Sequence, residues 1–301
     1  MNDVWLDTDI GGDVDDAAAL LCAIRHPAIH LIGVSTVLNR VEINTWIARE
    51  MLARAGITTI PVLPGAVAHL AGGDGPGDWL PSHGRLAPEL PRATPADDES
   101  RIAAIAAAMT GIPEPFHLVT VGPLTNIARL LQHAPDLPDR WLSVRCMGGW
   151  IDGRHPEYNL SADAPASRIV LDRLAPHLVG LEASTYKLTR QETEEALDLS
   201  DPASAVLLDC YREYRLHADW HEGPAIAPLT LFDAITLLSL VRPQDFDFQP
   251  LRLTLADDGR LHRADNGALH RAEDGAPVTY AMSADWDALK SLITSLLRGD
   301  L

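Results

Sequence analysis

Short apolar runs alternate with amphipathic runs along the first two thirds of the sequence, and this order restricts the fold more than any other feature. "VWLD" at 4–7 and "IHLIGVSTV" at 29–37 have the length and composition of buried strands. The runs that follow them, 15–26 and 43–56, have the apolar spacing of helices, and Gly56 is a predicted C-cap. The alternation continues through 60–66, 101–110, 116–122, 123–133, 141–149, 164–174 and 177–183.

Strands and helices in alternation predict an α/β fold with an open, mostly parallel sheet flanked by helices, a Rossmann-like core. Residues 71–100 are rich in glycine and proline and predict a long loop. No repeat and no linker divides the chain, so we expect a single domain of residues 1–301. In the last third, helices are predicted at 203–220, 228–240 and 285–297, and strands at 251–255 and 276–282.

Composition restricts the partners and the compartment. A formal net charge of −18 argues against nucleic acid and against an anionic membrane surface as partners. No apolar run reaches the ~20 residues of a membrane helix, and "MNDVW" lacks the pattern of a signal peptide. Cys22, Cys146 and Cys210 stand in apolar segments without the spacing of metal ligands, so we expect buried free thiols and a cytoplasmic protein.

A dense acidic cluster follows the first predicted strand. Five aspartates fall within ten positions: Asp7, Asp9, Asp13, Asp15 and Asp16. Like charges this close repel one another, so the cluster needs a compensating partner. In one interpretation the aspartates favour the start of a helix and are solvated. In another they supply the oxygen ligands that a hard divalent cation prefers.

A third interpretation is a phosphoryl-transfer aspartate of the haloacid dehalogenase type. "DTDIG" fits only the first half of that pattern, which places its nucleophile in a DxDx(T/V) stretch after the first strand. This chemistry also needs a lysine near the phosphate. The chain has only Lys187 and Lys290, and neither stands in a suitable segment. The cation site is therefore favoured over the phosphatase.

Polar residues also follow other predicted strands. In doubly wound sheets, ligands bind outside the carboxyl ends of the strands. The acidic cluster lies at such an end, and so do Asn39, the turn at 121–122 and the segment 148–159. We expect these four loops to converge on one crevice.

Five segments, in order over residues 4–240, resemble the motifs of the inosine–uridine-type nucleoside hydrolases. "LDTDIGGDVDDAAAL" resembles the family's N-terminal DxDPGxDDxxA, and "GVSTVLN" resembles the segment that ends in a substrate-binding asparagine. "LVTVGPLTNIARL", "MGGWIDGRHPEYNLSADAPAS" and "LTLFDAI" resemble three later motifs. The resemblance implies the nucleoside hydrolase fold, hydrolysis of the N-glycosidic bond of a ribonucleoside, a bound Ca²⁺, and a homodimer or homotetramer.

The resemblance also implies roles for single residues. Asp9 is the expected general base on water and a calcium ligand, and Asp7 is expected to support the site. The other implied calcium ligands are Asp16, the carbonyl of Val121, and Asp233. Ribose hydroxyls are implied to contact Asp15, Asn39, Glu157 and Asn159.

Two departures from the family pattern leave questions open. "DIGGDVDD" holds two extra residues before Asp15 and Asp16, so Asp13 competes for one of their roles. Phe232 precedes Asp233 where many relatives have a histidine, a candidate acid for the leaving base, and phenylalanine has no proton to donate. Candidates to contact or protonate the base instead are His83, Trp220 and His221, with His155 as a further one.

The sequence therefore predicts a Ca²⁺-dependent ribonucleoside hydrolase that works by water attack through an oxocarbenium-like transition state. One alternative is a family member that hydrolyses another ribosyl or glycosyl compound. The other is a non-catalytic homologue that binds metal and sugar without efficient turnover.

Overall fold

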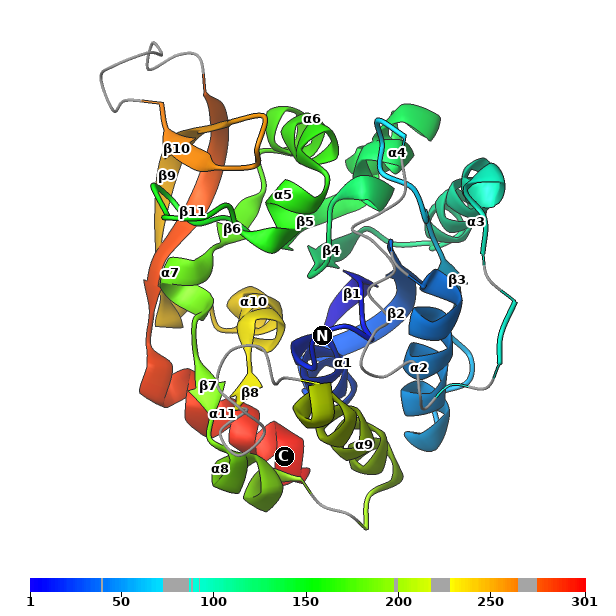
Figure 1. The fold of residues 1–301 in the computed structure, drawn as a ribbon, viewed down its shortest axis with the longest axis vertical. Helices are drawn as coiled ribbons and strands as arrows, with labels where there is room; N and C mark the ends of the chain where they lie inside the picture. Colours follow the sequence, from blue (N-terminus) through cyan, green and yellow to red (C-terminus); the bar gives the residue numbers. More distant parts are fainter. Residues whose placement is uncertain are drawn as a thin grey trace.

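A large, mostly parallel sheet runs through the middle of the molecule (Figure 1). The computed structural model describes residues 1–38, 40–72, 87, 89–91, 93–197, 200–217, 228–264 and 275–301. Within these residues the sheet has the order β10-β9-β11-β6-β5-β4-β1-β2-β3. Its strands are β1 (Asn2–Thr8), β2 (Ile29–Thr36), β3 (Val62–Pro64), β4 (Phe116–Thr120), β5 (Trp141–Met147), β6 (His177–Val179), β9 (Phe246–Leu255), β10 (Leu261–Arg263) and β11 (Ala276–Ala284).

The pairing confirms the predicted sheet. The six adjacent strands β6-β5-β4-β1-β2-β3 run parallel to one another, and β11 pairs parallel with β6. β9 pairs antiparallel with both β11 and β10. β1 lies between β2 and β4, near the middle of the parallel part. Its carboxyl end is therefore flanked by the carboxyl ends of two neighbours.

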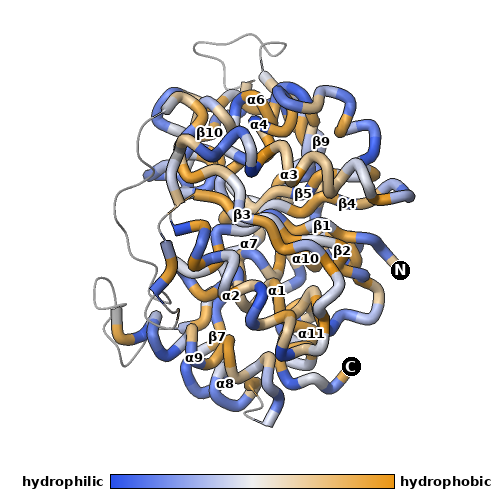
Figure 2. Tube along the Cα trace, turned by 90° about the vertical axis from the view of Figure 1, so that its right-hand side faces the viewer, coloured by the Kyte–Doolittle hydropathy of each residue, from blue (hydrophilic) through white to orange (hydrophobic). Residues whose placement is uncertain are grey.

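Helices cover both faces of the sheet, as the alternation predicts. Side chains of β1 alternate between the faces: Val4 and Leu6 pack into one hydrophobic core and Trp5 into the other. In Figure 2 the hydrophobic segments concentrate along the sheet. The first core includes α1 (Asp15–Arg25), α2 (Val41–Arg54), α9 (Pro202–His217), α10 (Phe232–Val241) and α11 (Trp286–Arg298); the second includes α3 (Asp98–Thr110), α4 (Thr125–His133) and α6 (Ala164–Leu174).

Two predicted elements were wrong in part. The strand expected at 177–183 ends at Val179, because Gly180 begins the one-turn helix α7 (Leu181–Ser184). A Cβ on Gly180 would lie 1.9 Å from the hydroxyl oxygen of Tyr280, so only glycine fits there. The helix expected at 228–240 begins only at Phe232, because Leu229–Thr230 (β8) pairs with Lys187–Leu188 (β7).

The remaining predictions concern a helix end, a loop and the short elements. Gly56 follows α2 with φ +76°, the left-handed conformation of a helix C-terminus. Most of the predicted loop at 71–100 lies outside the described residues, and its last three residues are already the start of α3. Short elements were not predicted: α5 (Tyr158–Ala162), α8 (Arg190–Ala196), β10, and 3₁₀ turns at Pro95–Asp97, Leu137–Arg140 and Pro243–Asp245.

The three cysteines are buried with free thiols, as predicted. Among the described helices none is both long enough and apolar enough to cross a membrane. The compartment, the single domain and the oligomeric state stay predictions.

Candidate active site

A cavity of about 400 Å³ lies at the carboxyl ends of β1, β4, β5 and β6. The acidic loop after β1 forms one wall, and Val121, Met147 and the segment that follows β5 form another. None of the described lining residues is a lysine or an arginine. Three of the four loops predicted to converge therefore do so. The carboxylates that line the cavity are Asp9, Asp13, Asp15, Asp16, Glu157 and Asp233.

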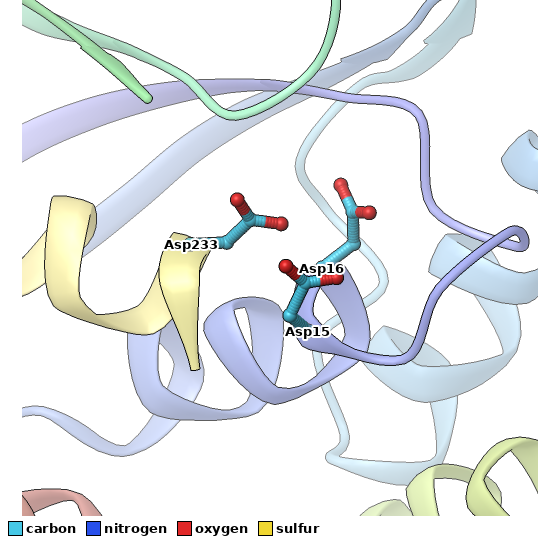
Figure 3. A group of neighbouring side chains, drawn as sticks. All are labelled: Asp15, Asp16 and Asp233. Carbon is cyan, nitrogen blue, oxygen red and sulfur yellow. The ribbon is translucent and has the colours of Figure 1, made fainter. Parts of the chain in front are cut away.

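Three of these carboxylates lie close together (Figure 3), and because all three are buried they form the floor of the cavity. Asp15 and Asp16 come from the first turn of α1, and Asp233 comes from the first turn of α10. One oxygen from each lies within 4.8 Å of those from the other two, and all three residues are buried. The positive ends of two helix dipoles favour negative charge here. A buried, oxygen-only set of this kind fits a hard divalent cation.

Without a cation these carboxyls resist ionisation. Burial raises the pKa of Asp15, Asp16 and Asp233 well above the usual range, and the charges of neighbouring aspartates raise it further. A bound cation would lower these pKa values again, because its positive charge stabilises the ionised carboxylates.

We therefore expect the metal-free protein to lose stability as pH rises. The unfolded carboxyls titrate near 3.8 and the folded ones higher, so between these values the folded state binds more protons. The contribution of these carboxyls to the free energy of unfolding is therefore fully present below about pH 3.8, and it is lost as pH rises through the folded pKa values. In EDTA, the melting temperature should fall by about 2–5 °C per pH unit between pH 5.5 and 7.5. Saturating CaCl₂ should flatten this slope, and equal slopes with and without calcium would contradict the cation site.

Asp9 lines the same cavity outside the group of three. It is half-buried at the end of β1, and its pKa is raised well above the usual range by burial and then by the charge of Asp15. The turn after β4 packs directly against it, since a Cβ on Gly122 would lie 2.7 Å from Asp9 Oδ1. Glycine at position 122 thus leaves room for the Asp9 carboxylate at the cavity wall.

Thr8 holds one of the floor carboxylates in place, a role that was not predicted from the sequence. Its hydroxyl donates to Asp16 Oδ1 and accepts from the backbone N–H of Ile10 at 3.1 Å. This chain of hydrogen bonds fixes the Asp16 carboxylate relative to the end of β1.

Asp7 lies beneath the cavity rather than in its wall. It is fully buried, and burial raises its pKa to about 7. Its Oδ1 accepts hydrogen bonds from Ser35 Oγ and, at 2.8 Å, from Asn126 Nδ2. Asn126 also donates to the carbonyl of Thr36 at 3.0 Å and accepts from the N–H of Ala66 at 2.8 Å. Asn126 thus connects the ends of β1, β2 and β3 from the start of α4.

We expect Asn126→Ala to lower the free energy of unfolding by about 2–4 kcal/mol, because it removes three buried hydrogen bonds at three strand ends and takes away the partner of the Ala66 N–H. Urea denaturation of the calcium-saturated protein measures this. Asn2→Ala is the matched control: it removes one hydrogen bond, to the carbonyl of Ala28 at 3.0 Å, and should cost about 1 kcal/mol or less. Equal losses in the two variants would show that the network under the cavity has no special weight.

Glu157 and Asn159 join two walls of the cavity. Glu157 caps α5: its Oε1 accepts from the N–H of Asn159 at 2.7 Å, and its Oε2 accepts from the N–H groups of Gly149 and Leu160 at 2.9 and 3.0 Å. Asn159 Nδ2 donates to the carbonyl of Val121 at 2.8 Å. Since a carbonyl oxygen has two lone pairs, this bond leaves one for a cation.

The remaining predicted residues divide into two groups. Asp13 lines the cavity but is not among the three clustered carboxylates, and its Oδ1 accepts from the N–H of Val14 at 2.6 Å and from Thr230 Oγ1 at 3.3 Å. Outside the described residues lie Asn39, His83, Trp220 and His221. No role was predicted for several other lining residues, among them Met147 at the end of β5, Trp150 in the segment between β5 and α5, Tyr158 at the start of α5, and Leu181 after β6. Their one sequence signal is a place at or beyond the end of a strand.

Residues 4–291 match the profile of the inosine-uridine preferring nucleoside hydrolases. The chain belongs to this family of enzymes. A non-specific ribonucleoside hydrolase RihC of Salmonella enteritidis is 28% identical over 275 residues, which cover 85% of this chain and 84% of that protein. A RihC of Escherichia coli is 27% identical over 274 residues, with the same coverage.

Solved structures of this family have the same fold. An inosine-uridine preferring nucleoside hydrolase from Bacillus anthracis superposes with a TM-score of 0.74 at 22% identity, over 99% of both chains. The plant nucleoside hydrolase PpNRh1 gives 0.78 at 21% identity, again over 99% of both chains. The predicted nucleoside hydrolase fold is thus confirmed.

Proposed function

We propose that this nucleoside hydrolase cleaves the N-glycosidic bond of a ribonucleoside, the substrate named for its RihC relatives, with Ca²⁺ as its cofactor. The observation that carries the proposal is the meeting of Asp15, Asp16 and Asp233 at the floor of a cavity that Asp9 also lines. An oxygen-only ligand set without lysine or arginine in the described wall suits a hard cation and a sugar.

The reaction makes use of these carboxylates. As the bond from C1′ to the base nitrogen breaks, its electron pair leaves with the base and positive charge develops on the sugar ring. Buried carboxylates held in place before the reaction stabilise that charge. Asp9 takes a proton from the water that attacks C1′, and we expect this attack to invert the configuration at C1′.

The other residues hold the cation and the ribose. Calcium, when bound, would lower the pKa of the attacking water and hold the vicinal hydroxyls of ribose. The proposed cation ligands are the carboxylates of Asp9, Asp16 and Asp233 and the carbonyl of Val121. The proposed contacts to ribose hydroxyls come from Asp15, Glu157 and Asn159, with Asn39 beyond the described residues. Asp15 lies in the same carboxylate group as the cation ligands, so it is suited to contact both the cation and the sugar.

A second candidate has one observation in its favour. Phe232, which cannot donate a proton, lines the cavity beside Asp233. A ribosyl or glycosyl compound whose leaving group departs without protonation would suit this wall. Calcium-dependent hydrolysis confined to such activated compounds would favour this candidate.

The experiment is a panel of inosine, uridine and their 2′-deoxy counterparts, with free base and reducing sugar measured together in CaCl₂. We expect at least one ribonucleoside to give equal amounts of base and ribose without added phosphate. Its deoxy counterpart should react at least about 100-fold more slowly, because contacts to the 2′-hydroxyl are lost. Calcium-loaded protein that hydrolyses no ribosyl compound would overturn the proposal and favour the non-catalytic binding protein.

A further inference from the structure

The open end of the cavity carries an imidazole, that of His155. The floor carboxylates Asp15, Asp16 and Asp233 are at most 6% exposed, whereas His155 is an exposed residue of the same wall. This difference in exposure places His155 nearer to solvent than the floor carboxylates. A ribonucleoside whose ribose contacts the floor would extend its base toward this end of the cavity. Among the described lining residues, His155 is the only histidine.

The wall around His155 suits a planar, apolar group. Trp150, Tyr158 and Phe232 contribute three aromatic rings to the cavity, and Met147 and Leu181 contribute apolar side chains. Aromatic faces stack on a nucleobase and keep water from it. These residues fit a heterocyclic leaving group better than a second sugar, which would need hydroxyl partners.

The segment that carries His155 is held in place from three sides. Glu157 Oε2 accepts from the N–H of Gly149 at 2.9 Å, and Glu182 Oε1 accepts from the N–H of Ile151 at 2.9 Å. The N–H of Asp152 donates to the carbonyl of Leu261 at 3.0 Å. Residue 155 therefore belongs to a segment whose backbone is fixed to α5, α7 and β10.

His155 is also close in sequence to a sugar-side residue. It precedes Glu157 by two positions, so the two Cα atoms lie at most about 7 Å apart. Glu157 is buried at the sugar side and His155 is exposed at the base side. One short segment thus contributes a residue to each side of the cavity, Glu157 to the sugar side and His155 to the base side.

We propose that His155 is the catalytic residue that protonates the leaving base, an inference that rests on the proposed function. The imidazolium of His155 gives its proton to a ring nitrogen of the base as the C1′–N bond breaks and the electron pair moves to the base. Asp9 takes a proton from water, whose oxygen forms the new bond to C1′. The sum is ribonucleoside plus water giving ribose plus neutral base, and solvent returns the proton to His155.

The test compares two substrates that differ in their need for an acid. Inosine needs protonation of its base, whereas the nitrophenolate of 4-nitrophenyl β-D-ribofuranoside leaves without it. We expect His155→Gln to lower kcat on inosine by about 100-fold or more, since general acids contribute 10²–10⁴-fold. On the nitrophenyl riboside the same variant should stay within about threefold of the wild type, because that substrate does not use the acid.

Two further variants separate catalysis from position. His262 Nδ1 lies 3.0 Å from Asp152 Oδ1, so His262→Gln loosens the same segment without reaching the cavity wall. It should change both substrates by less than about threefold. Tyr158→Phe removes the hydroxyl of a neighbouring wall residue, and this variant should leave the preference between the two substrates unchanged.

Each other outcome counts against His155. Equal losses on both substrates in His155→Gln would show that the residue only shapes the wall. Unchanged inosine hydrolysis in His155→Gln, or a selective loss in Tyr158→Phe instead, would assign the proton to another donor. Wild-type protein active only on the nitrophenyl riboside would show that no acid operates. Calcium-loaded wild type inactive on both substrates would overturn the proposed function itself, and the role of His155 with it.

Discussion

Asp9→Asn is expected to lower kcat on 4-nitrophenyl β-D-ribofuranoside by about 10³-fold, the range in which removal of a general base falls. Asparagine keeps one oxygen for a cation but cannot take a proton from water. The nitrophenyl substrate isolates this effect, because its leaving group needs no acid. Calcium affinity, measured by isothermal titration calorimetry, should change by less than about tenfold, because residue 9 is half-buried and lies outside the three clustered carboxylates, which remain.

Asp13→Asn is the matched control in the same loop. Asp13 is half-buried, lines the cavity, and lies outside the group of three carboxylates. It should lose less than about tenfold in kcat, well below the range for removal of a general base. A larger loss in Asp13→Asn than in Asp9→Asn would show that the extra residues of the acidic loop move the base to position 13.

Asp233→Asn is expected to weaken calcium binding by about 100-fold or more, because calcium affinity depends on the number of charged oxygen ligands. Asp233 is 2% exposed, and its carboxylate is the third member of the group that it forms with Asp15 and Asp16. Activity should disappear at micromolar calcium and return in part at millimolar calcium. Calorimetry and activity, each measured against free calcium, give the two readouts.

A second buried aspartate controls for packing. Asp163 is 2% exposed and caps α6 outside the cavity wall, where it accepts from the N–H of Ala166 at 3.2 Å and from Thr125 Oγ1 at 2.7 Å. Asp163→Asn should cost stability without changing calcium affinity. If Asp233→Asn binds calcium as tightly as Asp163→Asn does, the three clustered carboxylates are not the cation site.

The main strands and helices could be predicted because each carries its own period. β1 and α1 are long enough for strand and helix patterns to show in the sequence alone. The short elements could not be predicted, because contacts distant in sequence determine them. α7 begins where Gly180 meets the Tyr280 hydroxyl, and β8 exists because it pairs with β7.

The candidate site divides in the same way. Asp9, Asp15, Asp16 and Asp233 could be found from the sequence, since their motifs directly follow strands or begin helices. Their support could not be found, because Asn126 reaches Asp7 across 119 positions of the chain. Trp150 and Tyr158 were missed for a related reason. Their segment turns at Asp152, whose φ is +52°, and the hydrogen bonds that hold this turn come from other elements.

The most direct test of the central claim is the calcium dependence of nitrophenyl riboside hydrolysis by the wild-type protein. The assay depends only on the cation, the aspartates and the ribose. We predict that EDTA abolishes the release of nitrophenolate, and that added calcium restores it along the binding curve measured by calorimetry. Hydrolysis that is indifferent to EDTA, or no hydrolysis by protein shown to hold calcium, would contradict the account.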